Sequence, residues 1–162
     1  MTMRSASLFT AIAFVAMMGA VSQTAFAQDA AKDDQPSLYD RLGGLAPISV
    51  VVSDFIDALV PDATLNKNPA IDAARKRVPA AYLKYHVTAM VCQVTGGPCT
   101  YHGRAMKESH AHLNITEAEW DRMVTIFKEV LAKHGVPEKE TQELLTVVGS
   151  TKADIVVAAQ AK

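Results

Sequence analysis

Apolar residues along this chain recur mainly at the spacing of an α-helix. In residues 46–60, 79–95 and 114–135 they lie three or four positions apart, and polar residues fill the other faces. The β-branched residues of 46–60 favour a strand by propensity, but the strict alternation of a half-buried strand is missing. No other segment is a candidate strand, and there is no internal repeat. The pattern therefore predicts an all-α fold in a single domain.

Six helical segments are expected, four longer and two short. They cover residues 37–42, 46–60, 79–95, 105–113, 114–135 and a last stretch from Pro137 whose apolar residues continue to Val156. Ser37 is a suitable N-cap for the first segment, and Thr116 with Glu119 has the spacing of a capping box. Pro79 suits the first turn of the helix that it opens.

Glycine and proline mark the breaks between these segments. The Gly-Gly pair at 43–44 and the Gly-Gly-Pro run at 96–98 end helices abruptly and allow sharp changes of direction. Residues 61–76 are polar and interrupted, so we expect a loop there with one helical turn.

The first 27 residues have the form of a secretory signal. Arg4 precedes an apolar run at 8–21, and a small-x-small pattern follows at 25–27. The run is too short for a permanent membrane span, although an uncleaved anchor is the alternative. We expect a signal peptide at 1–27, a flexible leader at 28–36, the domain at 37–158 and a tail at 159–162. The mature chain is then exported, in the periplasm of a Gram-negative-type cell, with no stable membrane anchor.

Charge excludes one class of partner. Without Arg4 the chain carries 15 basic and 17 acidic residues, a formal charge of −2, and the two signs are mixed along it. There is no basic stripe of the kind that binds nucleic acid. Cys92 and Cys99 remain, and export makes a disulfide chemically allowed. The sequence leaves a bond and two free thiols equally open.

Two histidines lie on the apolar faces of predicted helices. Met106, His110 and Leu113 fall at i, i+4 and i+7 of the stretch AMKESHAHL, so they share one face. His112 is two positions from His110, about 200° around the helix, and faces solvent. His86 lies between Leu83 and Met90 on the apolar side of its own helix.

A buried imidazole needs a partner, because an unsatisfied ring nitrogen in a dry core costs about 1–3 kcal/mol. A lone histidine usually finds a backbone carbonyl or a hydroxyl. Two of them, His86 and His110, on the apolar faces of successive helices point to a large flat group between the helices. Haem fits that description, since a neutral imidazole is a standard axial ligand of its iron.

The order and spacing of several motifs make the chain resemble a truncated haemoglobin. These motifs are SLYDRLGG near the start, QVTGGPCTYHGRAMKESHAHLNIT in the middle, and HGVPEKE with ADIV near the end. The similarity is greatest to the group 1-like members that keep both Gly-Gly corners, and it covers about residues 37–157. The resemblance implies a two-over-two helical sandwich around non-covalently bound haem b.

The resemblance also implies roles for particular residues. His110 matches the proximal iron ligand, and His86 matches a distal position from which some members bind the iron as a sixth ligand. Other candidate residues at the cofactor are Phe55, Leu83, Val87, Tyr101 and Met106. For Tyr101, simple packing is equally open. Arg104 and Lys107 either pair with haem propionates or are solvated.

Four departures from the family pattern change the expected chemistry. Ile56 stands where a tyrosine commonly anchors bound O2, and Val87 where many relatives have a glutamine. Asn68 and Pro69 replace a phenylalanine pair at the haem edge. Thr151 matches a histidine through which some relatives attach haem covalently, and there is no Cys-x-x-Cys-His motif. Tyrosine-locked O2 binding is therefore not expected, whereas haem binding is.

We therefore expect a haem protein that reversibly binds O2, NO or CO, as in oxygen transport, rather than an enzyme. The same site also allows electron transfer through a bis-histidine iron, or peroxidase-like or NO-dioxygenating turnover with a redox partner. A remote alternative without haem is a periplasmic copper or zinc site. Its ligands would be Cys99, His102, His110 and His112, whose spacing matches no standard zinc pattern.

The remaining aromatic and histidine residues have simpler expectations. Trp120 is expected in the core, and Tyr85 is expected to face outward. The orientation of Tyr82 stays open. His102 and His134 are expected to be exposed, with His134 near a helix C-terminus where a positive charge is favourable.

Overall fold

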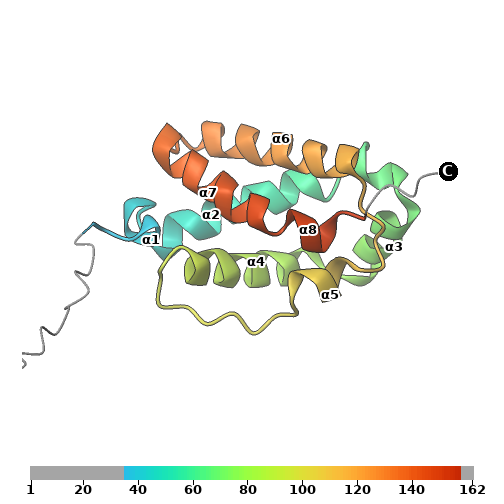
Figure 1. Cartoon of the computed structure of the whole chain (residues 1–162), viewed down its shortest axis with the longest axis horizontal. Helices are drawn as coiled ribbons and strands as arrows, with labels where there is room; N and C mark the ends of the chain where they lie inside the picture. Colours follow the sequence, from blue (N-terminus) through green and yellow to red (C-terminus); the bar gives the residue numbers. More distant parts are fainter. Residues whose placement is uncertain (1–34, 158–162) are drawn as a thin grey trace, which may run out of the picture. The chain divides into compact units, whose positions relative to one another are not determined.

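A computed structural model of the chain describes residues 35–157. The expected signal peptide, nearly all of the leader and the tail lie outside the described residues. The described part is helical (Figure 1), as the apolar pattern predicted. None of its helices has both the length and the apolar character that crossing a bilayer requires.

Between residues 35 and 157 the helices follow one another with short connections, apart from a long loop between residues 95 and 105. In chain order the elements are α1 (Leu38–Arg41), α2 (Leu45–Leu59), the 3-10 turn η1 (Leu65–Lys67), α3 (Pro69–Arg77), α4 (Ala80–Val94), α5 (Met106–His110), α6 (Glu117–Lys133), α7 (Glu138–Ser150) and α8 (Lys152–Ile155).

The predicted caps are present. The hydroxyl of Ser37 accepts the N–H of Asp40 at 3.1 Å and starts α1. At the start of α6, Thr116 accepts the N–H of Glu119, and the Glu119 carboxylate accepts the N–H of Thr116 at 2.7 Å. Both caps satisfy N–H groups that the first helical turn leaves without an acceptor.

The expected loop at 61–76 is wrong for most of its length, because it contains η1 and the nine-residue helix α3. Asn68 begins α3 by accepting the N–H groups of Ala70 at 2.9 Å and Ile71 at 3.3 Å. Pro69 occupies the first turn, where its missing N–H is harmless. Ile71 alone is buried, and a single buried residue gives too little apolar periodicity to reveal a helix.

The last helix also differs from the expected one, because it breaks at Thr151 into α7 and α8. The hydroxyl of Thr151 donates to the Val148 carbonyl at 2.8 Å, which occupies an acceptor at the end of α7. After α8 the chain extends, and the N–H of Val157 donates to the Ile115 carbonyl at 2.9 Å. Val156 therefore lies in an isolated parallel bridge with Ile115 and not in a helix.

Two layers of helices enclose the core, as expected for a two-over-two sandwich. α2 packs against both α4 and α6, and α7 lies beside α6 (Figure 1). One core cluster centres on the α2 residues Ile48, Val52 and Ile56, and the other on Phe127, Leu131 and Leu144. Phe55 packs against both clusters, and its ring meets the edge of Phe127 with centroids 5.2 Å apart.

The corner after α4 brings the two cysteines together. Cys92 and Cys99 form a disulfide with their Cα atoms 5.7 Å apart, which decides the alternative that the sequence left open. Gly97 is needed at this corner, because a Cβ there would lie 2.5 Å from the Tyr39 ring and 2.7 Å from the Cys92 carbonyl oxygen. The disulfide thus joins the end of α4 to the start of the long loop.

Candidate functional site

His110 ends the short helix α5. The expected continuation of this helix to Leu113 is wrong, because the chain turns there, with the Leu113 N–H donating to the His110 carbonyl at 2.9 Å. Nδ1 of His110 lies 2.8 Å from the carbonyl oxygen of Met106. A carbonyl only accepts, so Nδ1 carries the proton and donates it. Nε2 is then the basic nitrogen and has its lone pair available.

The surroundings of His110 favour its neutral form. Burial lowers the pKa of His110, and the nearby charges of His112 and Arg104 lower it further, against the opposing effect of the Met106 carbonyl. Only the neutral imidazole offers a lone pair to a metal ion. His112 is exposed, as predicted, so the two histidines do differ in burial.

His86 is partly buried on α4 and lies among aromatic side chains. Its ring centroid is 4.2 Å from that of Tyr82, 5.1 Å from that of Tyr85 and 6.0 Å from that of Tyr101. Nδ1 of His86 is fully buried, and within residues 35–157 it has no hydrogen-bond partner. A buried ring nitrogen without a partner is costly, so this position fits a site that a further group completes.

The apolar candidates lie where α2 faces α4. Phe55, Leu83 and Val87 all pack against the core cluster of Ile48, Val52 and Ile56. Ile56 itself is 2% exposed, so the position of the usual tyrosine is occupied by a core side chain. Phe55, Leu83 and Val87 therefore belong to the apolar packing between α2 and α4.

Tyr101 comes from the long loop, which runs back along α4 (Figure 1). Its N–H donates to Oε1 of Gln93 at 2.6 Å, and its hydroxyl donates to the Arg104 carbonyl at 2.9 Å. Burial and the nearby Tyr82 raise the pKa of Tyr101, so the hydroxyl keeps its proton and its role as donor. Tyr101 thus contacts His86. The sequence analysis placed Tyr101 either at the cofactor or in simple packing, and it did not name His86 as a neighbour.

The candidate residues form three groups. His86 lies with Tyr101, the apolar residues lie between α2 and α4, and Met106 holds His110 on α5. The main packing partner of α4 is α2, whereas that of α5 is α8. The two histidine-bearing helices therefore do not use each other as their main packing surface.

Asn68 contributes to this region in a way that the sequence did not reveal. Besides capping α3, it donates from Nδ2 to the Leu113 carbonyl at 2.9 Å. This bond fixes the chain three residues after His110. An Asn-Pro pair is a signal for a helix start that could have identified the cap. The long-range partner had no such signal, because the contact joins segments far apart in the sequence.

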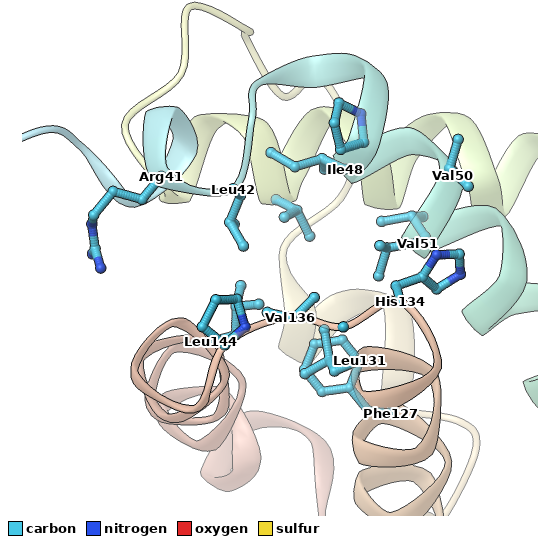
Figure 2. A pocket seen from close by; sticks show the side chains of 15 residues that line it. Arg41, Leu42, Ile48, Val50, Val51, Phe127, Leu131, His134, Val136 and Leu144 are labelled. Atoms are coloured by element: carbon cyan, nitrogen blue, oxygen red, sulfur yellow. The ribbon is translucent and has the colours of Figure 1, made fainter.

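An apolar pocket of about 370 Å³ lies elsewhere, between the α1–α2 and α6–α7 layers (Figure 2). It is lined by residues such as Leu42, Val51, Leu131 and Val136, and by none of the seven candidates. His134 at its edge was expected to be exposed. Its side chain is only 22% exposed, and its Nε2 lies 2.8 Å from Oδ2 of Asp54.

The alternative of a copper or zinc site required Cys99 as its sulfur ligand. Cys99 is bonded to Cys92 and offers no free thiolate. Within the described part of the chain, no three His, Cys, Asp or Glu side chains gather in a way that holds a metal ion.

Comparison with known proteins decides the family. The family model of bacterial-like globins matches residues 37–157, most of the chain. This chain is a bacterial-like globin. The globin is 31% identical over 120 residues to the group 1 truncated hemoglobin GlbN of Nostoc sp., covering 74% of this chain and 96% of the relative. The predicted resemblance to group 1 truncated haemoglobins is confirmed.

Solved structures agree on the fold of this globin. The truncated hemoglobin of Tetrahymena pyriformis superposes with a TM-score of 0.66 at 21% identity, over 76% of this chain and all of that one. The 2/2 hemoglobin of Synechococcus sp. PCC 7002, in its cyanomet state with covalently attached heme, superposes with a TM-score of 0.65 at 23% identity, over 75% and 98%. The predicted two-over-two sandwich is confirmed.

Proposed function

We propose that this globin holds haem b non-covalently through His110 and binds a diatomic gas reversibly. Haem iron, when bound, supplies the coordination position at which O2, NO or CO binds. The single observation that carries the proposal is the bond from Nδ1 of His110 to the Met106 carbonyl, because it leaves Nε2 as the metal-binding nitrogen. Membership of the globin family supports it.

Met106 and His110 work together in this proposal. A backbone carbonyl that accepts from Nδ1 fixes the tautomer, orients the ring and makes the other nitrogen more basic. The lowered pKa of His110, which burial causes, keeps the imidazole neutral at neutral pH. Both effects keep Nε2 unprotonated, so the imidazole can bind a metal ion as soon as a cofactor enters.

Non-covalent binding fits the residues of this chain. The Synechococcus neighbour carries covalently attached heme. Here Thr151 stands at the position that resembles the attaching histidine, and its hydroxyl is engaged with the Val148 carbonyl. The chain also has no Cys-x-x-Cys-His motif. The interactions of the haem ring are then packing contacts, to which Phe55, Leu83 and Val87 contribute.

His86 is the polar residue on the opposite side of the proposed site. Ile56 and Val87 offer no hydrogen-bond donor, so His86 either donates to the gas or binds the iron as a sixth ligand. The buried, unpartnered Nδ1 favours a ring that another group completes. The same observation supports a second candidate function, electron transfer through an iron held by His110 and His86 together.

We also propose that the protein works outside the cytoplasm. The signal-like residues 1–27 support export. The Cys92–Cys99 disulfide supports it independently, because such bonds persist in oxidising compartments and are rare where thiols are kept reduced.

The test is the visible spectrum of the mature chain, residues 28–162, purified with haem. Wild type is expected to show an intense Soret band, and His110→Ala to lose most of its haem. The matched control is His112→Ala, an exposed histidine two residues away, which is expected to keep full occupancy. Normal haem content in His110→Ala would reject His110 as the ligand.

His86→Ala separates the two candidate functions. A six-coordinate ferrous spectrum in wild type that becomes five-coordinate in His86→Ala supports direct ligation by His86, which electron transfer requires and which an incoming gas would have to displace. A wild-type spectrum that is already five-coordinate rejects the bis-histidine iron and leaves reversible gas binding.

A further inference from the structure

The long loop after α4 folds back along that helix (Figure 1). It carries Tyr101 to His86. The two rings meet edge to face, with centroids 6.0 Å apart and planes at 89°. Tyr82 and Tyr85 contact the same imidazole from α4 itself. Tyr101 is thus the contact that comes from outside the helix, and its position depends on how the loop is held.

Three interactions hold Tyr101. Its N–H donates to the Gln93 side chain at 2.6 Å, which ties the loop to α4. Its hydroxyl donates to the Arg104 carbonyl at 2.9 Å and closes a short turn. Its ring and hydroxyl lie over Gly103, where an added Cβ would be 2.1 Å from the hydroxyl oxygen. These contacts fix the position of the Tyr101 side chain within the loop.

The Cys92–Cys99 disulfide fixes the start of the same loop. Cys92 is fully buried on α4, less than two turns after His86, and Cys99 is two residues before Tyr101. The bond closes the intervening Gly-Gly-Pro corner. The disulfide therefore joins the helix that carries His86 to the loop that carries Tyr101.

We propose that Tyr101 is a positioning residue for His86 and that the Cys92–Cys99 disulfide holds it in place. Reduction of the disulfide then frees the loop, and His86 loses the ring that restricts its motion. The inference rests on the proposed function, because the consequence is a change in how readily His86 leaves the iron and admits a gas.

The redox step balances with a dithiol as the reductant. One thiolate of the dithiol attacks Sγ of Cys99, which is partly exposed, and Cys92 leaves as the thiolate. The second thiol of the reagent then displaces Cys99 and closes the reagent into a cyclic disulfide. Two electrons pass to the protein, and the two protons of the reagent end on Cys92 and Cys99.

The experiment uses the mature, haem-loaded ferrous protein and measures the rate of CO binding where release of His86 limits it. Removing an aromatic edge contact in Tyr101→Ala is expected to raise this rate about threefold to tenfold. Tyr101→Phe keeps the ring and is expected to stay within about twofold of wild type. Thr100→Ala, at the exposed neighbouring residue, is the control and is expected to match wild type.

The disulfide is tested with the same readout. Dithiothreitol is expected to accelerate CO binding in wild type to the rate of the Cys92→Ala/Cys99→Ala double variant, and to leave that variant unchanged. The CO-binding rate of the reduced wild type can be measured even if the double variant does not fold. Thiol titration confirms that the two cysteines have been reduced.

A direct measurement follows the His86 ring protons by NMR in the CO-bound protein. The ring current of Tyr101 shifts these signals, and Tyr101→Ala is expected to move them, whereas Tyr101→Phe is expected to restore them. Unchanged CO rates and unchanged His86 signals in Tyr101→Ala and in reduced wild type would overturn the proposal.

Failure of the proposal for Tyr101 can be distinguished from failure of the proposed function. If the wild-type chain takes up no haem, or if it is five-coordinate and His86→Ala leaves CO binding unchanged, the proposed role of His86 fails. In that case the His86 ring signals are compared in the haem-free wild type, Tyr101→Ala and reduced protein, and this comparison still decides whether Tyr101 positions that ring.

Discussion

Single side chains fix the segment that follows His110. Asn68 both caps α3 with its side-chain oxygen and donates from Nδ2 to the Leu113 carbonyl. Its neighbour in space, Asn114, has a φ of 50°, a left-handed conformation that asparagine tolerates better than most residues. These two asparagines let the chain turn sharply between α5 and α6.

Asn68→Ala is expected to lower the free energy of unfolding by about 1–2 kcal/mol, since it removes a helix cap and a bond to a backbone carbonyl. Asn68→Asp keeps the capping oxygen and loses only the donor to Leu113, so a smaller loss is expected. Urea unfolding of the three proteins measures both values. An Asn68→Ala protein as stable as wild type would contradict the assigned cap.

At the same scale, the sequence predicted burial better than bonding. Helical spacing correctly separated the partly buried His110 from the exposed His112. A backbone carbonyl or carboxylate was expected to accept from the second ring nitrogen of His110, but the sequence did not identify Met106 as that partner. A periodic pattern identifies the face of a helix and not the rotation of a ring. His134 shows the other failure, since its partner Asp54 lies on a different helix.

At the scale of elements, the connection from α2 to η1 is held by one carboxylate. Asp62 accepts from Nε and Nη2 of Arg122 at 3.0 and 2.8 Å, and from the N–H of Leu65 at 2.9 Å. Burial raises the pKa of Asp62, but the bonds from Arg122 and Leu65 outweigh it, and the net pKa lies below the ordinary value of 3.8. The ionised form is thus favoured by folding.

Asp62→Asn is therefore expected to cost about 1.5–3 kcal/mol at neutral pH, the range for hydrogen bonds to a charged group. Because folding lowers the pKa of Asp62, its stabilisation is complete above the unfolded-state pKa of about 3.9 and is lost as the pH falls through the lower folded-state pKa. The difference from wild type is expected to be constant from about pH 5 to 8 and to shrink below about pH 4.

Urea unfolding of both proteins at several pH values tests this. Asp57→Asn, which breaks an exposed pair with Lys84, is the matched control and is expected to change stability by less than about 1 kcal/mol. A difference between wild type and Asp62→Asn that grows on acidification would contradict the assigned role.

Element prediction succeeded where an apolar face or a cap was strong. α2, α4 and α6 begin and end within three residues of the expected positions, whereas α3 was missed because it buries only Ile71. The break between α7 and α8 was also missed. Apolar residues continue on both sides of Thr151, so the pattern gives no sign of the break. The pairing of the chain after α8 with Ile115 is likewise a contact between distant segments.

For the whole molecule, motif order was more informative than composition. The SLYDRLGG corner, the central His110 motif and the final ADIV segment predicted the two-over-two fold that the family match confirms. The resemblance did not predict the Cys92–Cys99 bond, which the spacing of the cysteines left open. Nor did it predict that the C-terminal segment supports α5, because that support depends on distant contacts.

A chain that ends at Thr151 tests this support. It lacks α8, the pair between Lys152 and Glu117, and the Val157–Ile115 bond, so α5 loses its main packing partner. We expect haem to leave this protein about tenfold faster, which corresponds to about 1.4 kcal/mol. A chain that ends at Val157 keeps all three contacts and serves as the control. Transfer of haem to an acceptor protein measures the rates, and circular dichroism confirms that both chains are helical. Equal rates in the two chains would show that α8 does not support the segment that carries His110.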